Sequence, residues 1–355
     1  MPALGPDVPV PGFEVSINGT TLSAVAAAHV VRVSVEKDTE LPDMFTLEIV
    51  ASDELDDQFA WIDNAGLFPV GGSVEVKLGY ADQLTSLFKG EITGLEPSFA
   101  AGRAPVLVVR GYDRRHRLTR GRRTRSFVKK KDSDIAAQIA REASLTANAT
   151  DSGVTHDYVL QANQTDFEFL LERAGRINYE VVVEDKTLSF RPVANGQGAA
   201  LTLAADMDFL EFRPRLSAAG QVSDVEVRGW DPKNKKAVVG KAQSGAVSST
   251  MGGEKGGPAL SKGAFGAATG ALSRTPVAAQ AEADQMAAAR LNELALELIT
   301  GEAACAGSVL LLPGKVVDVT GAGERFSGQY YVTTTTHVYT ADGYTTRFSF
   351  RRNAL

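Results

Sequence analysis

The chain has 355 residues, of which 44% are hydrophobic and 23% are charged, and its formal net charge is −6. This length allows two or three domains with cores of their own, and the acidic balance argues against a general nucleic-acid binder. Cys305 is the single cysteine, which excludes an internal disulfide and a cysteine metal cluster. The first residues show no signal peptide and no window is apolar enough to span a bilayer. We therefore expect synthesis in the cytoplasm and no stable membrane insertion.

Alternating apolar residues predict six short strands in the first part of the chain, at 13–17, 31–35, 45–49, 74–78, 88–92 and 106–108. Asn18-Gly19, which follows the first run, is typical of a hairpin turn. A short helix is predicted around Phe59 and Trp61. So many short strands in succession predict a first β-barrel, tube-like domain over residues 1–115.

The apolar period then changes from two residues to about four. Ser133 can cap a helix that contains Ile135 and Ile139, and Thr165-x-x-Glu168 is a capping box that opens a second helix. Alternation over 179–183 and 188–190, with a turn between, predicts a hairpin. These elements predict a small α+β domain over residues 116–195.

Strand patterns resume at residue 201 and again close the chain, so residues 196–239 and 305–355 are assigned to a second β-barrel, tube-like domain. Glycine, alanine and serine dominate residues 240–275, and a segment with so little large apolar surface is expected to be a flexible loop. Residues 276–304 carry the longest helical pattern, an Ala-rich run with Met286 and Leu291, and form a predicted helical insertion before the last strands. The fold class is therefore mainly β with an α+β part.

One pattern occurs twice. Gly71-x-x-Val74-x-Val76 precedes Phe88-x-Gly90, and Gly314-x-x-Val317-x-Val319 precedes Phe326-x-Gly328. A further strand that ends in arginine follows each copy. The echo predicts two barrels of one kind within the chain, so that three chains would supply six similar units around one axis.

Ordered motifs along nearly the whole chain resemble the phage late control D family, which is similar to the N-terminal part of type VI secretion VgrG proteins. The motif residues include Phe88, Gly90, Gly111, Tyr112, Asp113, Trp230, Gly314, Phe326, Gly328 and His337. The resemblance implies a structural baseplate hub of a contractile tail or contractile injection system. Such a hub is a homotrimeric adaptor between a hexameric inner tube and a trimeric central spike.

The resemblance also implies the partners and the location. They are the inner tube protein, a separate spike protein, because the VgrG needle is not part of this sequence, and other baseplate subunits, all within an assembled virion tail or injection particle. The sequence leaves open whether the particle is a phage tail, a bacteriocin-like particle or an extracellular or intracellular injection system, and what its cargo or target is.

Eleven of the 37 lysines and arginines lie between Arg110 and Lys131. Only Tyr112 and Phe127 interleave with them, whereas nucleic-acid binders usually carry more stacking aromatics. We therefore interpret the run as a solvated face or as a subunit or tube interface, paired with acidic residues of a neighbouring subunit. The candidate residues are Arg114, Arg115, Arg117, Arg120, Arg122, Arg123 and Arg125. Whether they face the lumen, a subunit interface or solvent is open, and an oligomeric nucleic-acid-binding protein is the alternative.

No catalytic constellation is apparent. As catalytic bases His116 and His337 would need a nucleophile or carboxylate partner, and as metal ligands a neighbouring His, Cys or Glu. No metal-protease or hydrolase motif and no paired histidines occur. We expect structural histidines and no catalytic site, cofactor or metal. A baseplate-associated cell-wall hydrolase is the enzyme alternative, but it would need a positioned acidic pair in a helical domain.

Overall fold

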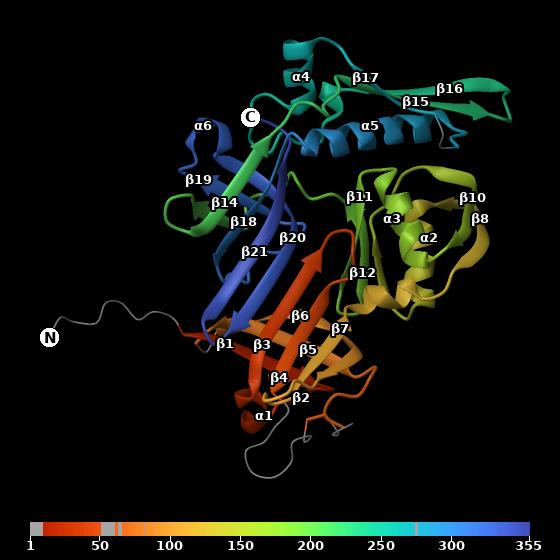
Figure 1. Ribbon diagram of the computed structural model, residues 1–355. Coiled ribbons are helices and arrows are strands. Elements are labelled where there is room, and N and C mark those ends of the chain that lie inside the picture. The colour runs from red at the N-terminus through yellow and green to blue at the C-terminus, as the bar shows by residue number, and fades with distance from the viewer. Residues whose placement is uncertain (1–9, 51–60, 63–65, 82, 274–275) are drawn as a thin grey trace.

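The computed structural model describes residues 10–50, 61–62, 66–81, 83–273 and 276–355 (Figure 1). The helix predicted around Phe59 and Trp61 lies largely outside these residues, and Trp61 itself lies in a turn. Strands dominate the described part, so the mainly-β prediction is confirmed. No helix in the described part is long and apolar enough to cross a membrane.

Most strands belong to one large sheet of thirteen strands. Its main path runs through β14 (Phe209–Leu216), β18 (Ile299–Ala306), β21 (Gly343–Arg352), β20 (Gly328–Thr340), β3 (Val30–Asp38), β4 (Met44–Val50), β7 (Val106–Tyr112), β6 (Gln83–Ser98), β5 (Ser73–Tyr80), β1 (Pro11–Ile17) and β2 (Thr20–Thr21). Beside β20, β19 (Val316–Thr320) pairs with it and carries β13 (Leu201–Ala204).

The two predicted barrels are halves of this one sheet, and the hydrogen bonding of the described strands closes neither half. The cause is that β3 pairs with β20 of the second half. A strand at the edge of one half therefore satisfies its backbone groups on the other half. Figure 1 shows the red and orange strands of the first half continuing into the blue strands of the second.

The halves are an internal repeat, as the echo predicted. The Gly71 N–H donates to the Ile92 carbonyl at 2.8 Å, and the Gly314 N–H donates to the Val332 carbonyl at 2.9 Å. The β6–β7 ladder has a bulge just after Ile92, and the β20–β21 ladder has one just after Val332. Equivalent hydrogen bonds and equivalent bulges indicate one architecture built twice.

The second part of the echo is displaced by two residues. Val76 pairs with Phe88, whereas its equivalent Val319 pairs with Gly328. Gly328 therefore occupies the position of Phe88, and Phe326 ends the short helix α6 (Gly323–Phe326). Side chains alternate between the two faces of a sheet, so a shift of two residues keeps each side chain on the same face. The sequence pattern can therefore still be recognised in the second copy.

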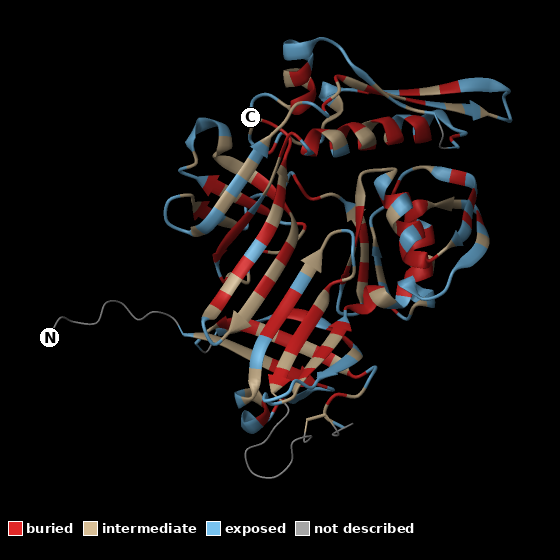
Figure 2. Ribbon diagram, in the orientation of Figure 1, coloured by how far each residue is buried: buried red, intermediate tan, exposed pale blue. Residues whose placement is uncertain are grey.

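In the cores of the two halves, facing positions keep the same combined side-chain volume although the individual residues differ. Phe45 on β4 lies opposite Gly111 on β7, and in the second half Gly301 on β18 lies opposite Phe350 on β21. A Cβ atom at Gly111 would lie 2.4 Å from the Phe45 ring, and one at Gly301 would lie 2.6 Å from the Phe350 ring. Each ring thus requires a glycine across the ladder, with the two residues exchanged between strands. Figure 2 shows buried residues on the strands of both halves.

His337 lies on β20 in the core at 0% exposure. Its Nε2 is 3.1 Å from the Leu311 carbonyl, and its Nδ1 is 2.9 Å from the Tyr344 hydroxyl. Since a carbonyl can only accept, Nε2 carries the proton and Nδ1 accepts. Burial lowers the pKa of His337 to about 4, so the ring is neutral and structural.

His337 is expected to make the fold acid-sensitive. Its folded pKa of about 4 lies below the ordinary value of 6.5, so the unfolded chain takes up the proton first as the pH falls. The stabilising contribution is complete above pH 6.5 and is lost towards pH 4, by about 3 kcal/mol. Urea unfolding at pH 7 and pH 4.5 should show a smaller difference for His337→Gln than for the native chain. Equal differences would contradict this role.

The α+β unit follows the first half of the sheet. It begins with the 3₁₀ helix η1 (Arg114–Thr119) and continues through β8 (Arg123–Lys131), α2 (Asp132–Glu142), β9 (Thr146–Ala149), β10 (Thr155–Gln164), α3 (Asp166–Gly175), β11 (Tyr179–Glu184) and β12 (Thr187–Pro192). The predicted capping box is present, with the Glu168 N–H 3.1 Å from the Thr165 hydroxyl. The first helix starts two residues earlier than predicted, at Asp132 with Lys131 as its N-cap, and Ser133 bonds to Ser152 instead of capping it.

A third unit differs from the prediction. β15 (Asp224–Asp231) and β16 (Lys236–Gln243), expected in the second barrel, form a separate sheet with β17 (Thr269–Leu272) and pack against α5 (Gln280–Leu296). The predicted insertion 276–304 also gives its last residues to β18. The short helix α1 (Ala24–Ala28) and the 3₁₀ helix η2 (Ser244–Ala246) complete the described elements.

The segment 240–275 is not a loop without regular structure. Its described residues hold the end of β16, the helix α4 (Gly257–Phe265) and β17, and Met251 is 1% exposed. The small residues that suggested flexibility allow close packing instead. A Cβ atom at Gly240 would lie 2.2 Å from the Ala283 backbone, so glycine lets β16 approach α5.

Candidate interaction site at the basic run

The basic run divides into two clusters. Arg114, Arg115 and Arg117 lie on η1 between the large sheet and the α+β unit. Arg114 and Arg115 are buried and Arg117 is exposed, and we call the cluster the buried arginine node after the first two. Arg122 lies just before β8, and Arg123 and Arg125 lie on its first residues. We call these three the exposed arginine face, although Arg125 is partly buried. Arg120 lies between the clusters and is exposed.

Arg115 is the centre of the buried arginine node, at 2% exposure. Asp113 caps η1, because its Oδ1 accepts from the Arg115 N–H at 2.8 Å and its Oδ2 accepts from Arg115 Nε at 2.7 Å. The guanidinium also bonds the Asp43 carboxylate and, at 2.9 Å, the Asp38 carbonyl. Burial raises the pKa of Asp113 to about 6, against the opposing attraction of Arg115. The Arg115 guanidinium therefore makes its contacts within the chain and exposes little surface to a partner.

Glu91 on β6 contacts the other basic side chains of η1. It accepts from Arg117 Nε at 3.0 Å and lies 3.0 Å from His116 Nε2 and 3.4 Å from Arg114 Nε. Arg114 also bonds Asp185 in the β11–β12 turn. Burial lowers the pKa of His116 despite the nearby carboxylate. The node therefore fixes the α+β unit to β6 of the sheet.

The exposed arginine face has acidic partners within the chain. Arg122 pairs with Glu168 at 2.8 Å, and Arg123 lies 3.1 Å from Glu142. Arg125 pairs with Asp166 at 2.7 Å. All three arginines thus pair with acids at the ends of α2 and α3 of their own chain, and the expected pairing with acids of a neighbouring subunit stays a prediction. These acids face β8 because the helices pack on that strand. An interface role for the half-exposed Arg122 and Arg123 stays a prediction.

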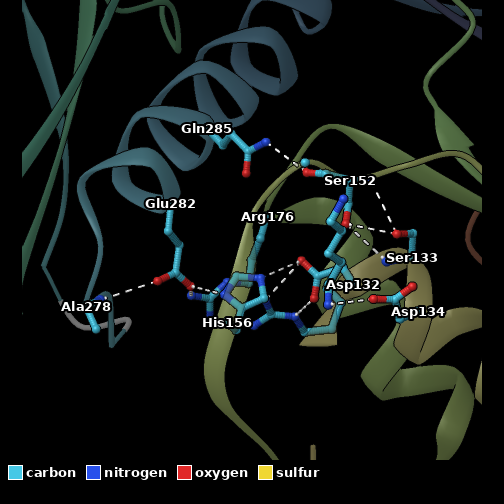
Figure 3. A network of polar contacts seen from close by, with 12 residues as sticks. Asp132, Ser133, Asp134, Ser152, His156, Arg176, Ala278, Glu282 and Gln285 are labelled. Atoms are coloured by element: carbon cyan, nitrogen blue, oxygen red, sulfur yellow. Dashed lines mark hydrogen bonds and ion pairs between the residues drawn. The ribbon is translucent and has the colours of Figure 1, made fainter. Parts of the chain in front are cut away.

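A second polar network was not predicted (Figure 3). Asp132, at the start of α2, is buried and accepts from Arg173 Nη2 at 3.0 Å, and its Oδ2 lies 3.1 Å from His156 Nε2. Burial raises the pKa of Asp132, but the hydrogen bonds from His156 and Arg173 outweigh it and hold the pKa below its usual value. Asp132 is therefore the anion of a buried ionic cluster.

This network continues from the α+β unit to α5. Arg176 donates to Glu282 at 2.7 Å, and Gln285 donates to the Ser152 carbonyl at 3.1 Å. Figure 3 shows Glu282 and Gln285 reaching from the helix toward the α+β unit. The partners are 106 and 133 residues apart in sequence, so no local pattern could have indicated these contacts.

The motif residues do not form a single site. Phe88 and Gly90 lie on β6, Gly111 and Tyr112 on β7, Asp113 at the cap of η1, Trp230 on β15, Gly314 before β19, Phe326 in α6, and Gly328 and His337 on β20. Of these, Gly111, Tyr112 and Asp113 lead directly into the buried arginine node, whereas Trp230 is an exposed side chain of the third unit. Most of them mark strands of the repeat. Among the described residues, no group of three or more His, Cys, Asp or Glu side chains could hold a metal ion.

The chain shares its fold, a large two-half sheet with an α+β unit beside it, with solved structures of phage tail proteins and of a type VI secretion component. The chain belongs to the family described as the Alg8 N-terminal domain, whose model matches residues 8–341. No curated protein matches the chain.

Three solved structures show the likeness. The prophage MuSo2 43 kDa tail protein from Shewanella oneidensis has a TM-score of 0.69 at 12% identity, over 96% of this chain and 98% of its own. The tail protein from Neisseria meningitidis MC58 has a TM-score of 0.67 at 14% identity, over 97% of each chain. The E. coli c3393 protein, a type VI secretion component described as similar to the T4 tail proteins gp27 and gp5, has a TM-score of 0.60 at 15% identity, over 96% and 77%. The resemblance to phage tail and VgrG proteins is thus confirmed at the level of the fold.

Proposed function

We propose that the chain is a structural baseplate hub of a contractile tail or contractile injection system, which joins the hexameric inner tube to the trimeric spike as a homotrimer. The observation that carries the proposal is the repeat of the large sheet. The strands β3, β4, β7 and β6 have their equivalents in β14, β18, β21 and β20. Both sets belong to one continuous sheet.

The repeat gives this chain two symmetries at once. Two equivalent sheet units per chain make six around a threefold axis, which suits contact with a sixfold tube. The chain itself repeats three times, which suits contact with a trimeric spike. The similar structures, which are tail proteins and a type VI secretion component, support the same class of assembly.

The polar contacts favour a mechanical role. The buried arginine node fixes the α+β unit to β6, and the network around Asp132 fixes the same unit to α5. His116 and His337 are the histidines that a catalytic function would need. His116 is instead hydrogen-bonded to Glu91 and His337 to Tyr344. Further partners of the proposed hub are a tube protein, a separate spike protein and other baseplate subunits, and the exposed arginine face and Arg120 are candidates for those contacts.

Electron cryomicroscopy of assembled particles tests the proposal. We expect three copies of the chain in one ring between the end of the tube and the spike, with the six sheet units facing the tube. Particles in which the chain lies in the sheath, or in a ring of two or six copies, would contradict the proposed hub.

A further inference from the structure

The two-stranded sheet of the α+β unit has one face in the core and one face toward solvent. Among the described strands, β8 and β10 pair only with each other. Phe127 on β8 lies opposite Val159 on β10, and both are buried in the apolar core that includes residues of α2 and α3. Because side chains alternate along a strand, the neighbours of these two residues lie on the outer face.

Three large apolar side chains lie on this outer face. Tyr158 is directly opposite Val128 in the ladder, and Leu160 follows on the same side of β10. Tyr158 is 60% exposed, Val128 58% and Leu160 48%. We call these three residues the apolar patch. Single exposed apolar residues are ordinary, whereas adjacent ones on one face are typical of a contact surface. Figure 1 shows β8 and β10 on the side of the α+β unit away from the large sheet.

A lysine in an unusual backbone conformation borders the apolar patch. Lys129 directly follows Val128 and has a φ of 51°, which is uncommon for a residue other than glycine. Val128 and Lys129 are both exposed although they are consecutive, so the alternation of β8 breaks at this point. The break leaves a positive charge at the surface next to the apolar patch.

The turn between β15 and β16 adds further positive charge. Lys233 in this turn lies with its Nζ 2.5 Å from the Asp157 carboxylate, in the residue before Tyr158. This contact holds the turn beside β10. The next lysine of the turn, Lys235, is exposed. Within the described residues, Lys233 has a carboxylate partner, whereas Lys129 and Lys235 form no ion pair. The border of the apolar patch therefore carries positive charge that the chain itself does not neutralise.

We infer that the apolar patch is a docking site for an acidic segment of a different subunit in the assembled particle. The apolar side chains of that segment cover Tyr158, Val128 and Leu160, and its carboxylates pair with Lys129 and Lys235. Opposite charges at the border favour this partner, since a basic segment would place like charges together. A tyrosine at the centre of a contact is a common source of binding energy. The inference rests on the proposed function, because it requires neighbouring baseplate subunits.

A nucleic acid fits this surface less well than a protein segment. Proteins that bind single strands stack successive bases on several aromatic side chains. Tyr158 is the one aromatic residue of the apolar patch, and Val128 and Leu160 offer no ring for stacking. The nearby Arg122 already pairs with Glu168 of α3. Aliphatic side chains of a partner protein match the apolar patch better than bases do.

Photocrosslinking in assembled particles tests the inference. The photoreactive residue p-benzoylphenylalanine, placed at Tyr158 in the full chain, should crosslink to a different baseplate subunit. Mass spectrometry should locate the link in a segment with an excess of aspartate and glutamate. The matched control carries the same photoreactive residue at Leu41, which is 61% exposed and lies between β3 and β4. The control should give at least about tenfold less of that product, because it lies outside the inferred contact.

The subunit identified in this way allows a second readout with purified proteins. Its affinity for the full chain should fall at least about tenfold in Tyr158→Ser, because the change removes the central apolar contact. The affinity should also fall in Lys129→Glu, which reverses a charge at the border. Leu41→Ser should bind as the native chain does, and circular dichroism should stay native for all three variants.

The outcomes separate this inference from the proposed hub. Particles that contain the chain but give no crosslink from Tyr158 to another subunit would overturn the docking site and leave the hub standing. A crosslink to nucleic acid, to a second copy of the chain or to a basic segment would do the same. Purified particles that lack the chain would overturn both.

Discussion

Replacing Arg115 with methionine is expected to lower the free energy of unfolding by about 3–5 kcal/mol at pH 7. The change leaves the carboxylates of Asp43 and Asp113 buried together without the guanidinium that both of them bond. Methionine keeps much of the side-chain volume, so the loss reports the missing charge rather than a cavity. Urea denaturation of the variant and of the native chain, fitted in the same way, measures the difference in the free energy of unfolding.

The control for this variant is Arg122→Met, which breaks an exposed pair with Glu168. Exposed pairs contribute about 0–1 kcal/mol, so this variant should be close to native. Burial already raises the pKa of Asp113 to about 6, and without Arg115 this carboxyl would take up its proton at still higher pH in the folded state than in the unfolded chain. Its deficit should therefore shrink as the pH falls from 7 to 5. Equal losses for the two variants, or a deficit that is independent of pH, would contradict the buried arginine node.

Deleting residues 244–273 is expected to destabilise the protein strongly, although the composition of residues 240–275 predicted a flexible loop. The deletion removes β17, which pairs with β15, and the helix α4, whose Ser261 donates to the Gln221 carbonyl at 3.1 Å. Loss of the buried Met251 side chain alone should cost about 1.5–3 kcal/mol. The melting temperature of the deletion variant should fall clearly below that of the native chain.

The matched control removes only Gly198 and Ala199, two exposed residues before β13. Shortening an exposed connection changes stability little, so this variant should melt near the native temperature. A deletion of 244–273 that melts as the native chain does would show that the segment contributes no packing.

Local patterns predicted much of the fold. Strand alternation located most strands of the large sheet, and the capping box at Thr165 and Glu168 placed α3 correctly. The echo was readable because Gly71 and Gly314 perform the same backbone task at the entry of equivalent strands. Each of these signals depends on a few residues that are close in sequence.

What the sequence did not predict depends on contacts between distant residues. The pairing of β3 with β20 turns two predicted barrels into one open sheet, and no local pattern chooses between closure and extension. The ionic contacts of Arg115 with Asp43 and of Arg176 with Glu282 join residues 72 and 106 positions apart. The role of Gly240 is visible only once Ala283 is known to lie against it.

Native mass spectrometry of the chain, alone and co-expressed with the proposed tube and spike proteins, tests the central claim most directly. The two-unit sheet predicts three copies, in the isolated ring or in the complex with the spike. A monomer, dimer or hexamer in the assembled complex would contradict the account.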